Sequence, residues 1–376
     1  MQNHQLNCEK MKTSILDLPE ILIKKGLPFA IYSFPGKRNF NLVIQKNNIL
    51  DEINIIDINT VNGFVLANFN SAKTGLANYI KPDFFLTEND DLDQVQSFLQ
   101  NTDIKNDTHL TDNNNISEKE YLSRVEYLVS KVQTKELKKI VFSRVISKSV
   151  TNQIVLSKFL GELRKKYRGA FVNLFHIPGV GTWCGASPET LFKLIDDHYY
   201  SDSLAGTRIV SNDKEPDWSN KEHEEQQMVS SFIESVLSEL GVKKYEKIGP
   251  TNSKAGNLYH ILTTYKIPKK VIGQNAGKVI AGLHPTPAVC GLPKAEAFHM
   301  IQKAEQHQRR YYSGFIGPWK LNGQSQLFVN LRCAELGKNK INIYVGGGLT
   351  ASSIPEDEYQ ETVYKSQTLL SVVENL

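Results

Sequence analysis

The sequence predicts an α+β fold in which a large, layered antiparallel β-sheet core is surrounded by helices. Strand-like runs follow one another at hairpin-like spacing through most of the chain, and only a few helical segments interrupt them. The length of 376 residues is enough for one large or two ordinary domains. We find no internal repeat, and no G-x-G-x-x-G or Walker A motif that would indicate nucleotide binding.

The first hundred residues alternate short strand-like runs with helical pieces and contain no chemical motif that we can identify. The strand-like runs are PFAIYSF, LVIQ and GFVLANF. Residues 101–117 are rich in Asn and Asp and poor in apolar side chains, which predicts an exposed connection. This connection divides the chain into an N-terminal part, 1–117, and a larger part, 118–376.

The larger part begins with a predicted helix at 118–136, for which Ser117 is a suitable N-cap and which has an apolar stripe on one face. Further helices are expected near 153–168, 217–241, 294–309 and 355–374. The strand-like runs between them are KKIVFSRVI, AFVNLFHI, TLFKLI, HYYSDSLAG, LYHILTTY, SGFIGPW, SQLFVNLRCAEL and INIYVGGG. Long, regularly patterned segments of this kind indicate a single layered fold.

Composition excludes several classes of protein. The net charge is only +4 and the basic residues form no block, which argues against nucleic acid but suits an anionic small molecule. No apolar run is long enough to cross a bilayer, and the N-terminus lacks the apolar core of a signal peptide. Cys8, Cys184, Cys290 and Cys333 form no C-x-x-C pair, which indicates free thiols. We therefore expect a cytoplasmic protein with no membrane partner.

Acidic side chains lie on an otherwise apolar helix face near the end of the chain. Glu358, Glu361 and Lys365 are spaced i, i+3 and i+7, and their face continues into Leu369 and Val372. Charged groups on a face that should be buried are costly unless something pairs with them. A divalent cation together with an anionic ligand would provide that pairing.

A second acidic pair has the same pattern. Glu225 leads an apolar stripe at helical spacing, and Glu222 lies one turn earlier. Two such pairs suggest four carboxylates around one hard cation, and oxygen ligands favour magnesium. The alternative is that both pairs are the solvated ends of surface helices, and the pattern alone does not choose between the two.

Eight motifs then occur in a fixed order. They are KKIVFSR (138–144), GASPETL (185–191), LAGTR (204–208), KEHEEQQMV (221–229), LHPTPAVCGLPK (283–294), YYSGFIG (311–317), NLRCAEL (330–336) and YVGGGLTASSIPEDEYQETVYK (344–365). Together they resemble the chorismate-utilising enzymes, which include anthranilate, aminodeoxychorismate, salicylate and isochorismate synthases. The resemblance implies that 118–376 is the chorismate-binding catalytic region. Residues 1–117 would then be a divergent N-terminal part of the same fold.

Within the family, the HPTPAVCG run resembles the isochorismate synthase branch. The resemblance therefore implies a magnesium-dependent isomerase that adds water at C2 of chorismate and expels the C4 hydroxyl. Ala205 stands where aminodeoxychorismate synthases often carry a nucleophilic lysine, which disfavours that activity. Gln226 follows Glu225 where many relatives have His, so no titrating side chain is present there. The alternative within the family is salicylate synthase, which also eliminates pyruvate.

The resemblance assigns two residues to proton transfer. Lys139 would be the base that activates water, and strand alternation favours its burial together with Val141 and Ser143. Glu189 would be the acid that protonates the leaving hydroxyl, which requires a raised pKa. The bland alternatives are a surface lysine beside Lys138 and a glutamate in a turn.

The remaining site residues also follow from the resemblance. Glu225 and Glu361 would hold Mg²⁺, with Glu222 and Glu358 acting directly or through water. Arg332 offers a rigid fork for a carboxylate of the substrate. The other expected substrate contacts are Gly206, Thr207, His260, Tyr344, Gly346 and Lys365. For His260 the alternative is an ordinary core histidine.

Partners and pathway are less constrained by the sequence. Chorismate is the expected small-molecule substrate, and the HPTPA run disfavours an anthranilate synthase that would need a glutaminase partner. We expect a monomer. Isochorismate feeds menaquinone or catecholate siderophores, and menaquinone is favoured only because it is the more widespread use.

Overall fold

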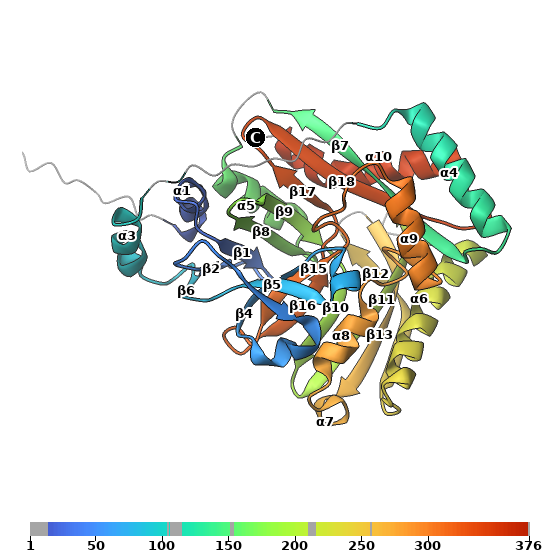
Figure 1. Ribbon diagram of the computed structural model, residues 1–376, viewed down its shortest axis with the longest axis horizontal. Coiled ribbons are helices and arrows are strands. Elements are labelled where there is room, and N and C mark those ends of the chain that lie inside the picture. The colour runs from blue at the N-terminus through green and yellow to red at the C-terminus, as the bar shows by residue number, and fades with distance from the viewer. Residues whose placement is uncertain are drawn as a thin grey trace, which may run out of the picture.

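The computed structural model describes residues 14–103, 105, 115–150, 154–209, 216–255 and 258–374, with residues 207, 209, 221, 255 and 258 described by backbone alone. Most of the predicted connection at 101–117 lies outside these ranges, as does Cys8. The three other cysteines are free and buried. Where the chain is described, its strands form two nine-stranded sheets in which every pairing is antiparallel. The predicted α+β class with a layered antiparallel core is therefore confirmed (Figure 1).

Sheet A contains the strands that surround the C-terminal glycine run. In spatial order they are β14 (Gly291–Leu292), β7 (Lys139–Ser149), β18 (Lys340–Leu349), β17 (Cys333–Leu336), β9 (Gly181–Ser187), β8 (Phe171–Ile177), β1 (Phe29–Ser33), β2 (Asn41–Ile44) and β6 (Phe84–Thr87). β7 and β18 pair along their length, with Val141 opposite Gly348 and Ser143 opposite Gly346. This pairing brings the lysine motif and the glycine motif into register.

Sheet B is the second layer. In spatial order its strands are β12 (Glu246–Ala255), β13 (Leu258–Pro268), β11 (His198–Ile209), β10 (Thr190–Ile195), β16 (Ser325–Val329), β15 (Phe315–Trp319), β4 (Gly63–Ala67), β5 (Leu76–Ile80) and β3 (Asp51–Asn54). The two sheets pack through an aromatic core, in which Phe171 of β8 stacks on Phe328 of β16 with ring centroids 4.1 Å apart. Such close ring contacts bury large apolar area between the sheets.

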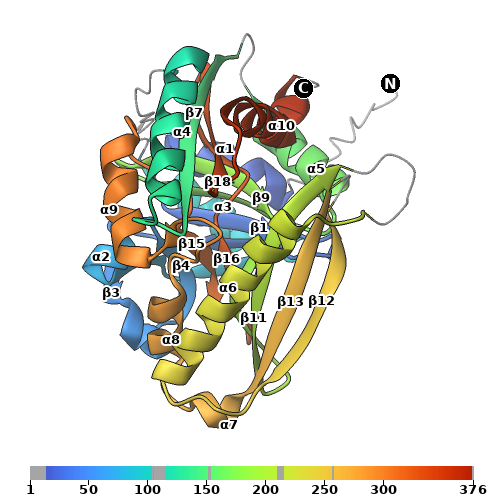
Figure 2. The ribbon, with the colours of Figure 1, turned by 90° about the vertical axis from the view of Figure 1, so that its right-hand side faces the viewer.

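Helices cover the outer faces of the two sheets. Apolar side chains of α1 (Leu18–Lys24), α5 (Leu156–Lys166) and α10 (Pro355–Val373) form one core with sheet A. Those of α6 (Asn220–Glu239) and α8 (Ala276–Leu283) form another with sheet B. α4 (Glu118–Gln133) and α9 (Lys294–Ala304) lie along β7, and Figure 2 shows α6 running beside β11 and β13. The shorter helices are α2 (Ser71–Thr74), α3 (Asp93–Gln100) and α7 (Lys269–Ile272), with 3₁₀ turns at Ile15–Asp17 and Ile55–Thr60.

The predicted elements are found with two corrections. The helix expected at 294–309 ends at Ala304, because Glu305 has an extended backbone and its carboxylate is bonded to β7. The run SQLFVNLRCAEL is not one strand, since it breaks into β16 and β17, which belong to different sheets. Arg332, at the break, has a positive φ of 49°. The chain therefore crosses from sheet B to sheet A at this arginine.

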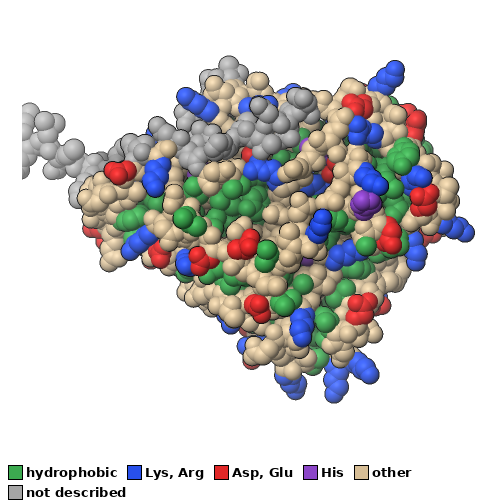
Figure 3. Space-filling view, in the orientation of Figure 1, with side chains coloured by type: hydrophobic (Ala, Val, Ile, Leu, Met, Phe, Trp, Pro, Cys, Tyr) green, Lys and Arg blue, Asp and Glu red, His purple; other side chains and the backbone are tan. Residues whose placement is uncertain are grey.

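The N-terminal strands belong to the same two sheets as the rest of the chain. β1, β2 and β6 extend sheet A, and β3, β4 and β5 extend sheet B. The boundary at 117/118 stays a prediction. Among the described helices, none combines the length and apolar character needed to cross a membrane. Acidic and basic side chains are interspersed over the face that Figure 3 shows.

Candidate active site

A cavity of about 160 Å³ collects most of the predicted site residues. Its walls come from β7, β11, β13, β18, α6, α10 and the segments before β10 and β14. The predicted residues that line it are Glu189, Gly206, Glu222, Glu225, His260, Arg332, Tyr344, Gly346, Glu361 and Lys365. The fold thus unites motifs that are spread over more than 170 positions of the sequence.

Lys139 lies directly behind this lining. Its side chain is 0% exposed, and its Nζ donates a hydrogen bond to Oε1 of Glu225 at 2.6 Å. The predicted burial of the strand face is therefore confirmed, and the surface-lysine alternative is wrong. Gly348 makes the approach possible, since a Cβ there would lie 2.8 Å from Cε of Lys139 and 2.9 Å from Oε1 of Glu225.

Glu189 is buried in the short segment between β9 and β10, with 3% of its surface exposed. Burial, the largest cause, and the nearby carboxyl of Asp202 raise the pKa of Glu189 to about 8. Its Oε1 accepts a long hydrogen bond of 3.5 Å from the hydroxyl of Thr286. A carboxyl group in this setting is protonated at neutral pH and can act as a general acid.

The acidic pair of α10 divides between the cavity and the protein interior. Glu361 pairs with Lys365 at 2.5 Å, and Nζ of Lys365 also donates to the carbonyl of Gly346 at 2.8 Å. Glu358 is buried, with 2% exposed, and a Cβ on Gly347 would lie 3.0 Å from its Oε2. Glu358 is therefore not at a solvated helix end, whereas the side chain of Glu361 is 40% exposed.

The acidic pair of α6 has a mixed position. Glu225 reaches the cavity and Lys139, as described above. Glu222 also lines the cavity, but its Oε2 accepts a 2.8 Å bond from the backbone N–H of Ser219, and its Oε1 pairs with Nε of Arg208 at 3.1 Å. Glu222 thus also caps α6, so the helix-end alternative describes part of its role.

The donor chemistry of these carboxylates fits a hard divalent cation. Glu222, Glu225 and Glu361 supply oxygen atoms to one cavity, which is the ligand type that magnesium prefers. Lys139, Arg208 and Lys365 provide the compensating positive charge. Within the described ranges, no three His, Cys, Asp or Glu side chains are grouped closely enough to form a ready metal site. Binding would require the carboxylates to move away from their cationic partners.

Gly206, His260 and Arg332 also line the cavity. Nδ1 of His260 bonds to the carbonyl of Gly206 at 2.8 Å, and burial lowers the pKa of this histidine to about 4, so it is neutral. Gly206 has a φ of +70°, where the pairing of β11 with β13 shifts register. Arg332 donates to the hydroxyl of Thr368 at 3.3 Å. For Thr207 the backbone lies in β11, and its side chain is outside what the structure describes.

Several residues in and around the cavity were not predicted. Tyr312 stacks on Tyr344 with centroids 5.8 Å apart, and Ala288 and Val289 form a wall. Thr286 belongs to the HPTPAVCG run, which served only to distinguish branches of the family. A polar residue in a motif otherwise rich in Pro and apolar residues was the available signal. Asp202 had no sequence signal, because its effect on Glu189 depends on tertiary packing.

Gln226 lies in a buried polar network instead of the cavity. Its Nε2 donates to the hydroxyls of Ser230 at 3.0 Å and Thr263 at 2.6 Å, and Ser230 donates to Ser203 at 3.2 Å. All these partners are neutral. The glutamine therefore fills its position as a structural hydrogen-bonding group, in agreement with the absence of a titrating side chain there.

Comparison with known proteins defines the class. A family described as chorismate binding enzyme matches residues 60–374, and the chain belongs to this family. It is therefore a chorismate-utilising enzyme that acts on a small molecule.

Individual relatives show which members of the family this chain resembles. The vibriobactin-specific isochorismate synthase of Vibrio cholerae is 28% identical over 263 residues, which cover 68% of this chain and 67% of the relative. Isochorismate synthase EntC of Escherichia coli is also 28% identical, over 64% of this chain and 63% of the relative.

A solved structure from Bacillus anthracis, described as a 2,3-dihydroxybenzoate-specific isochorismate synthase, superposes with a TM-score of 0.76 at 25% identity. The superposition covers 94% of this chain and 99% of that one. The chain therefore shares the fold of this structure over most of its length.

Proposed function

We propose that the protein is an isochorismate synthase. The observation that carries the proposal is one cavity lined by the buried carboxyl group of Glu189, whose pKa is raised, with the buried amine of Lys139 behind another part of its lining. Adding water at one ring carbon and expelling a hydroxyl at another needs a base and an acid at separate places. The names of the most similar relatives support the same activity.

In this mechanism Lys139 takes a proton from the water that attacks C2 of chorismate. Glu189 donates a proton to the C4 hydroxyl, which leaves as water. One water is added and one is released, so substrate and product are isomers. Glu189 suits this task because its raised pKa of about 8 keeps it protonated near neutral pH.

Magnesium is the proposed cofactor, held by Glu225 and Glu361, with Glu222 and Glu358 acting directly or through water. A lysine accepts a proton only in its neutral form, so Lys139 must lose its ion pair with Glu225 during turnover. A divalent cation on Glu225 would provide that carboxylate with another partner and would bind the ring carboxylate of the substrate.

Cationic side chains favour a dianionic substrate. Arg332 and Lys365 both line the cavity, and we assign Arg332 to the enolpyruvyl carboxylate because its planar fork matches a carboxylate in two bonds. The backbone at Gly346 and the ring of Tyr344 complete this side. We also assign Gly206, Thr207 and His260 to the substrate contacts.

Ala205 argues against a transferase reaction that uses a lysine nucleophile at this position. It lines the cavity, and no amine is available at that position. We propose that the enzyme works as a cytoplasmic monomer without a glutaminase partner. Added ammonium or glutamine should therefore yield no anthranilate from chorismate.

The decisive experiment is incubation of the pure protein with chorismate and magnesium, followed by separation of the products. We expect isochorismate in equilibrium with chorismate and little pyruvate. Pyruvate equal to the chorismate consumed at neutral pH would instead assign the chain to salicylate synthase. Traces of salicylate at high pH would leave the proposal standing, because elimination from isochorismate needs only a further proton shift.

For the pathway we propose menaquinone biosynthesis, with siderophore biosynthesis as the alternative that the vibriobactin-specific relative favours. Expression in a bacterium that lacks its menaquinone-specific isochorismate synthase, at native-like levels, should restore menaquinone. Failure to restore menaquinone, combined with rescue of catecholate production, would favour the siderophore pathway.

A further inference from the structure

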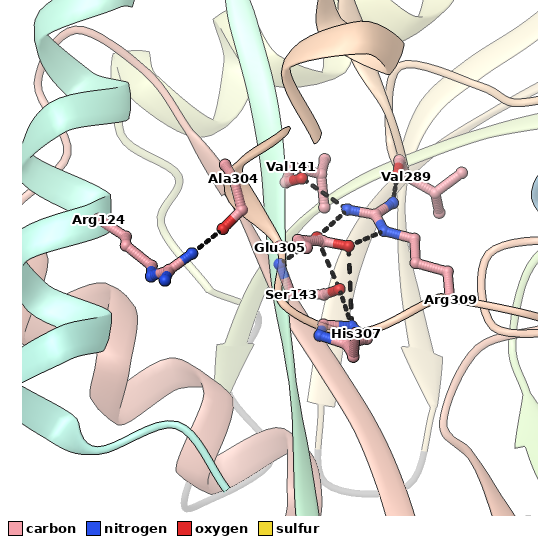
Figure 4. A network of polar contacts seen from close by, with 8 residues as sticks. All are labelled: Arg124, Val141, Ser143, Val289, Ala304, Glu305, His307 and Arg309. Atoms are coloured by element: carbon pink, nitrogen blue, oxygen red, sulfur yellow. Dashed lines mark hydrogen bonds and ion pairs between the residues drawn. The ribbon is translucent and has the colours of Figure 1, made fainter. Parts of the chain in front are cut away.

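A buried ionic network lies beside the cavity, and its two central residues are not part of the cavity lining. Arg309 and Glu305 form its centre, with 1% and 2% of their side chains exposed (Figure 4). Nε of Arg309 donates to Oε2 of Glu305 at 2.8 Å, and Nη2 donates to Oε1 at 2.6 Å. A two-bond arginine–carboxylate pair of this kind has a fixed geometry.

The same guanidinium joins two walls of the cavity. Nη1 donates to the carbonyl of Val289 at 2.6 Å, and Nη2 donates to the carbonyl of Val141 at 2.7 Å. Val141 and Val289 both line the cavity. Arg309 therefore bridges the strand β7 and the segment before β14.

Arg309 lies where the backbone hydrogen bonds between β7 and the segment before β14 end. The N–H of Val141 still donates to the carbonyl of Cys290 at 2.7 Å. Beyond that bond, the carbonyls of Val141 and Val289 accept from Arg309, and the N–H of Ser143 donates to Glu305 at 2.8 Å. The ion pair thus continues the edge of β7 with side-chain hydrogen bonds in place of a strand.

Each of the two walls is connected to one of the two proton-transfer groups. The wall formed by β7 carries Lys139, and the other wall contains Thr286, which contacts Glu189. Lys139 lies two residues before Val141 on β7. On the other wall, Thr286 contacts Glu189, and its carbonyl accepts from the N–H groups of Val289 at 3.0 Å and Cys290 at 2.9 Å. A shift of Val289 would therefore move the support of Glu189 relative to Lys139.

Further contacts hold the network in place. The hydroxyl of Ser143 bonds to Glu305 at 2.7 Å and lies 3.1 Å from Nε2 of His307, whose ring is 5.9 Å from that of Tyr344. Arg124 of α4 donates to the carbonyl of Ala304, which fixes the chain just before Glu305. Figure 4 shows Glu305 between Ser143 on β7 and Arg309.

We infer that Arg309 and Glu305 are positioning residues that set the spacing between the wall bearing Lys139 and the wall supporting Glu189. This inference rests on the proposed function, because the spacing matters only if both groups act on one substrate. A displacement of about 1 Å can cost roughly 10²-fold in rate even when the altered residue is remote from the reacting atoms.

The test is Arg309→Lys, with Arg310→Lys as the matched control. Lysine keeps the charge next to Glu305 but cannot reach both carbonyls with one ammonium group. Arg310 also pairs with a buried glutamate, Glu335, and donates to a backbone carbonyl, that of Val180 at 2.6 Å, but this carbonyl is not in the cavity wall. Both variants are assayed well below their melting temperatures.

We expect kcat of Arg309→Lys to fall by about 10- to 100-fold while KM for chorismate changes by less than about threefold. Arg310→Lys should keep kcat within about threefold of wild type, whatever its loss of stability. A kcat for Arg309→Lys near that of wild type would overturn the inference. So would an equal loss in Arg310→Lys, or a loss confined to KM.

If Arg309→Lys fails to fold, Glu305→Gln is tested in its place, and the same criteria apply to its kcat and KM. Its amide oxygen can still accept from Ser143, while the charge that orients Arg309 is lost. Rates are taken from chorismate consumption. Formation of salicylate by the wild type would therefore refute the proposed product and still leave this comparison valid. A wild-type protein that leaves chorismate unchanged would overturn both proposals.

Discussion

Lys139 and Glu225 are 86 positions apart in the chain, and their side chains meet at 2.6 Å in the folded protein. One is the proposed base and the other a proposed metal ligand. The contact joins sheet A to α6 on the outer face of sheet B, so it also connects the two layers at the cavity. A change in the side chain of either residue therefore affects the other.

Replacement of Lys139 by Ala should lower kcat by about 10²- to 10⁴-fold, the range expected for loss of a general base. Chorismate should still bind, because Arg332 and Lys365 remain. Kinetics and equilibrium binding measure the two effects separately. Lys138→Ala is the control, since its exposed side chain should be dispensable. Near-wild-type turnover in Lys139→Ala would refute its role.

Replacement of Glu189 by Gln should remove most activity, again by about 10²- to 10⁴-fold. In the wild type, kcat/KM should fall as pH rises through about 8, because the acid is then deprotonated. Asp202→Asn should move this decline to lower pH, since the Asp202 carboxyl raises the pKa of Glu189. A wild-type profile that stays flat to pH 9.5 would contradict the assignment.

Glu189 should also make the stability of the folded protein depend on pH. Its pKa is about 8 when folded and about 4.3 when unfolded, so between these values the folded state holds a proton that the unfolded chain releases. This contribution to stability is therefore lost as pH rises towards 8. Glu189→Gln cannot ionise, so its melting temperature relative to wild type should increase from pH 5 to pH 8.5. If this difference in melting temperature does not change with pH, the pKa of Glu189 is not raised.

Replacement of Glu361 by Gln should abolish turnover and leave the fold intact. EDTA should silence the wild type, and magnesium should restore it, if carboxylates hold the cation as proposed. Circular dichroism would report the fold, and product formation the activity. Glu356→Gln, at an exposed position on the same helix, should behave like wild type. Full activity of the wild type in EDTA would exclude the metal.

Replacement of Gly348 by Ala should impair catalysis, because its Cβ would come within 3.0 Å of both Lys139 and Glu225. We expect kcat to fall at least tenfold. Gly161→Ala is a matched control in α5, where a Cβ meets nothing within 4 Å. It should stabilise the protein by about 0.5–1 kcal/mol, as expected for glycine to alanine within a helix. Equal activities of the two variants would contradict the close approach at Gly348.

Periodicity predicted the long helices because each has an apolar face, but it missed elements without a period. β9 is buried along its whole length and contains Gly and Ser, so its sequence does not alternate. β12 is polar and is an edge strand. α8 has only eight residues, too few for a clear apolar face. In these cases neighbouring elements, and not local preference, determine the conformation.

The motifs predicted which residues line the cavity, but not the contacts between them. The helix predicted near 294–309 would have contained both Glu305 and Arg309, which are spaced i, i+4. The chain instead leaves the helix at Ala304, and the same pair bridges two cavity walls. Spacing alone does not distinguish these arrangements, because both place the two side chains in contact. The pairing of Lys139 with Glu225 likewise depends on how the sheets are layered.

The place of β18 within sheet A has a consequence for synthesis of the protein on the ribosome. β18 lies between β7 and β17, and both of these strands precede it in the sequence. Until that segment emerges, one edge of β7 has no partner, and unpaired strand edges promote association between chains. Sheet A therefore stays incomplete until β18 has been synthesised, and delays in elongation before that point would prolong the exposure of β7 to aggregation.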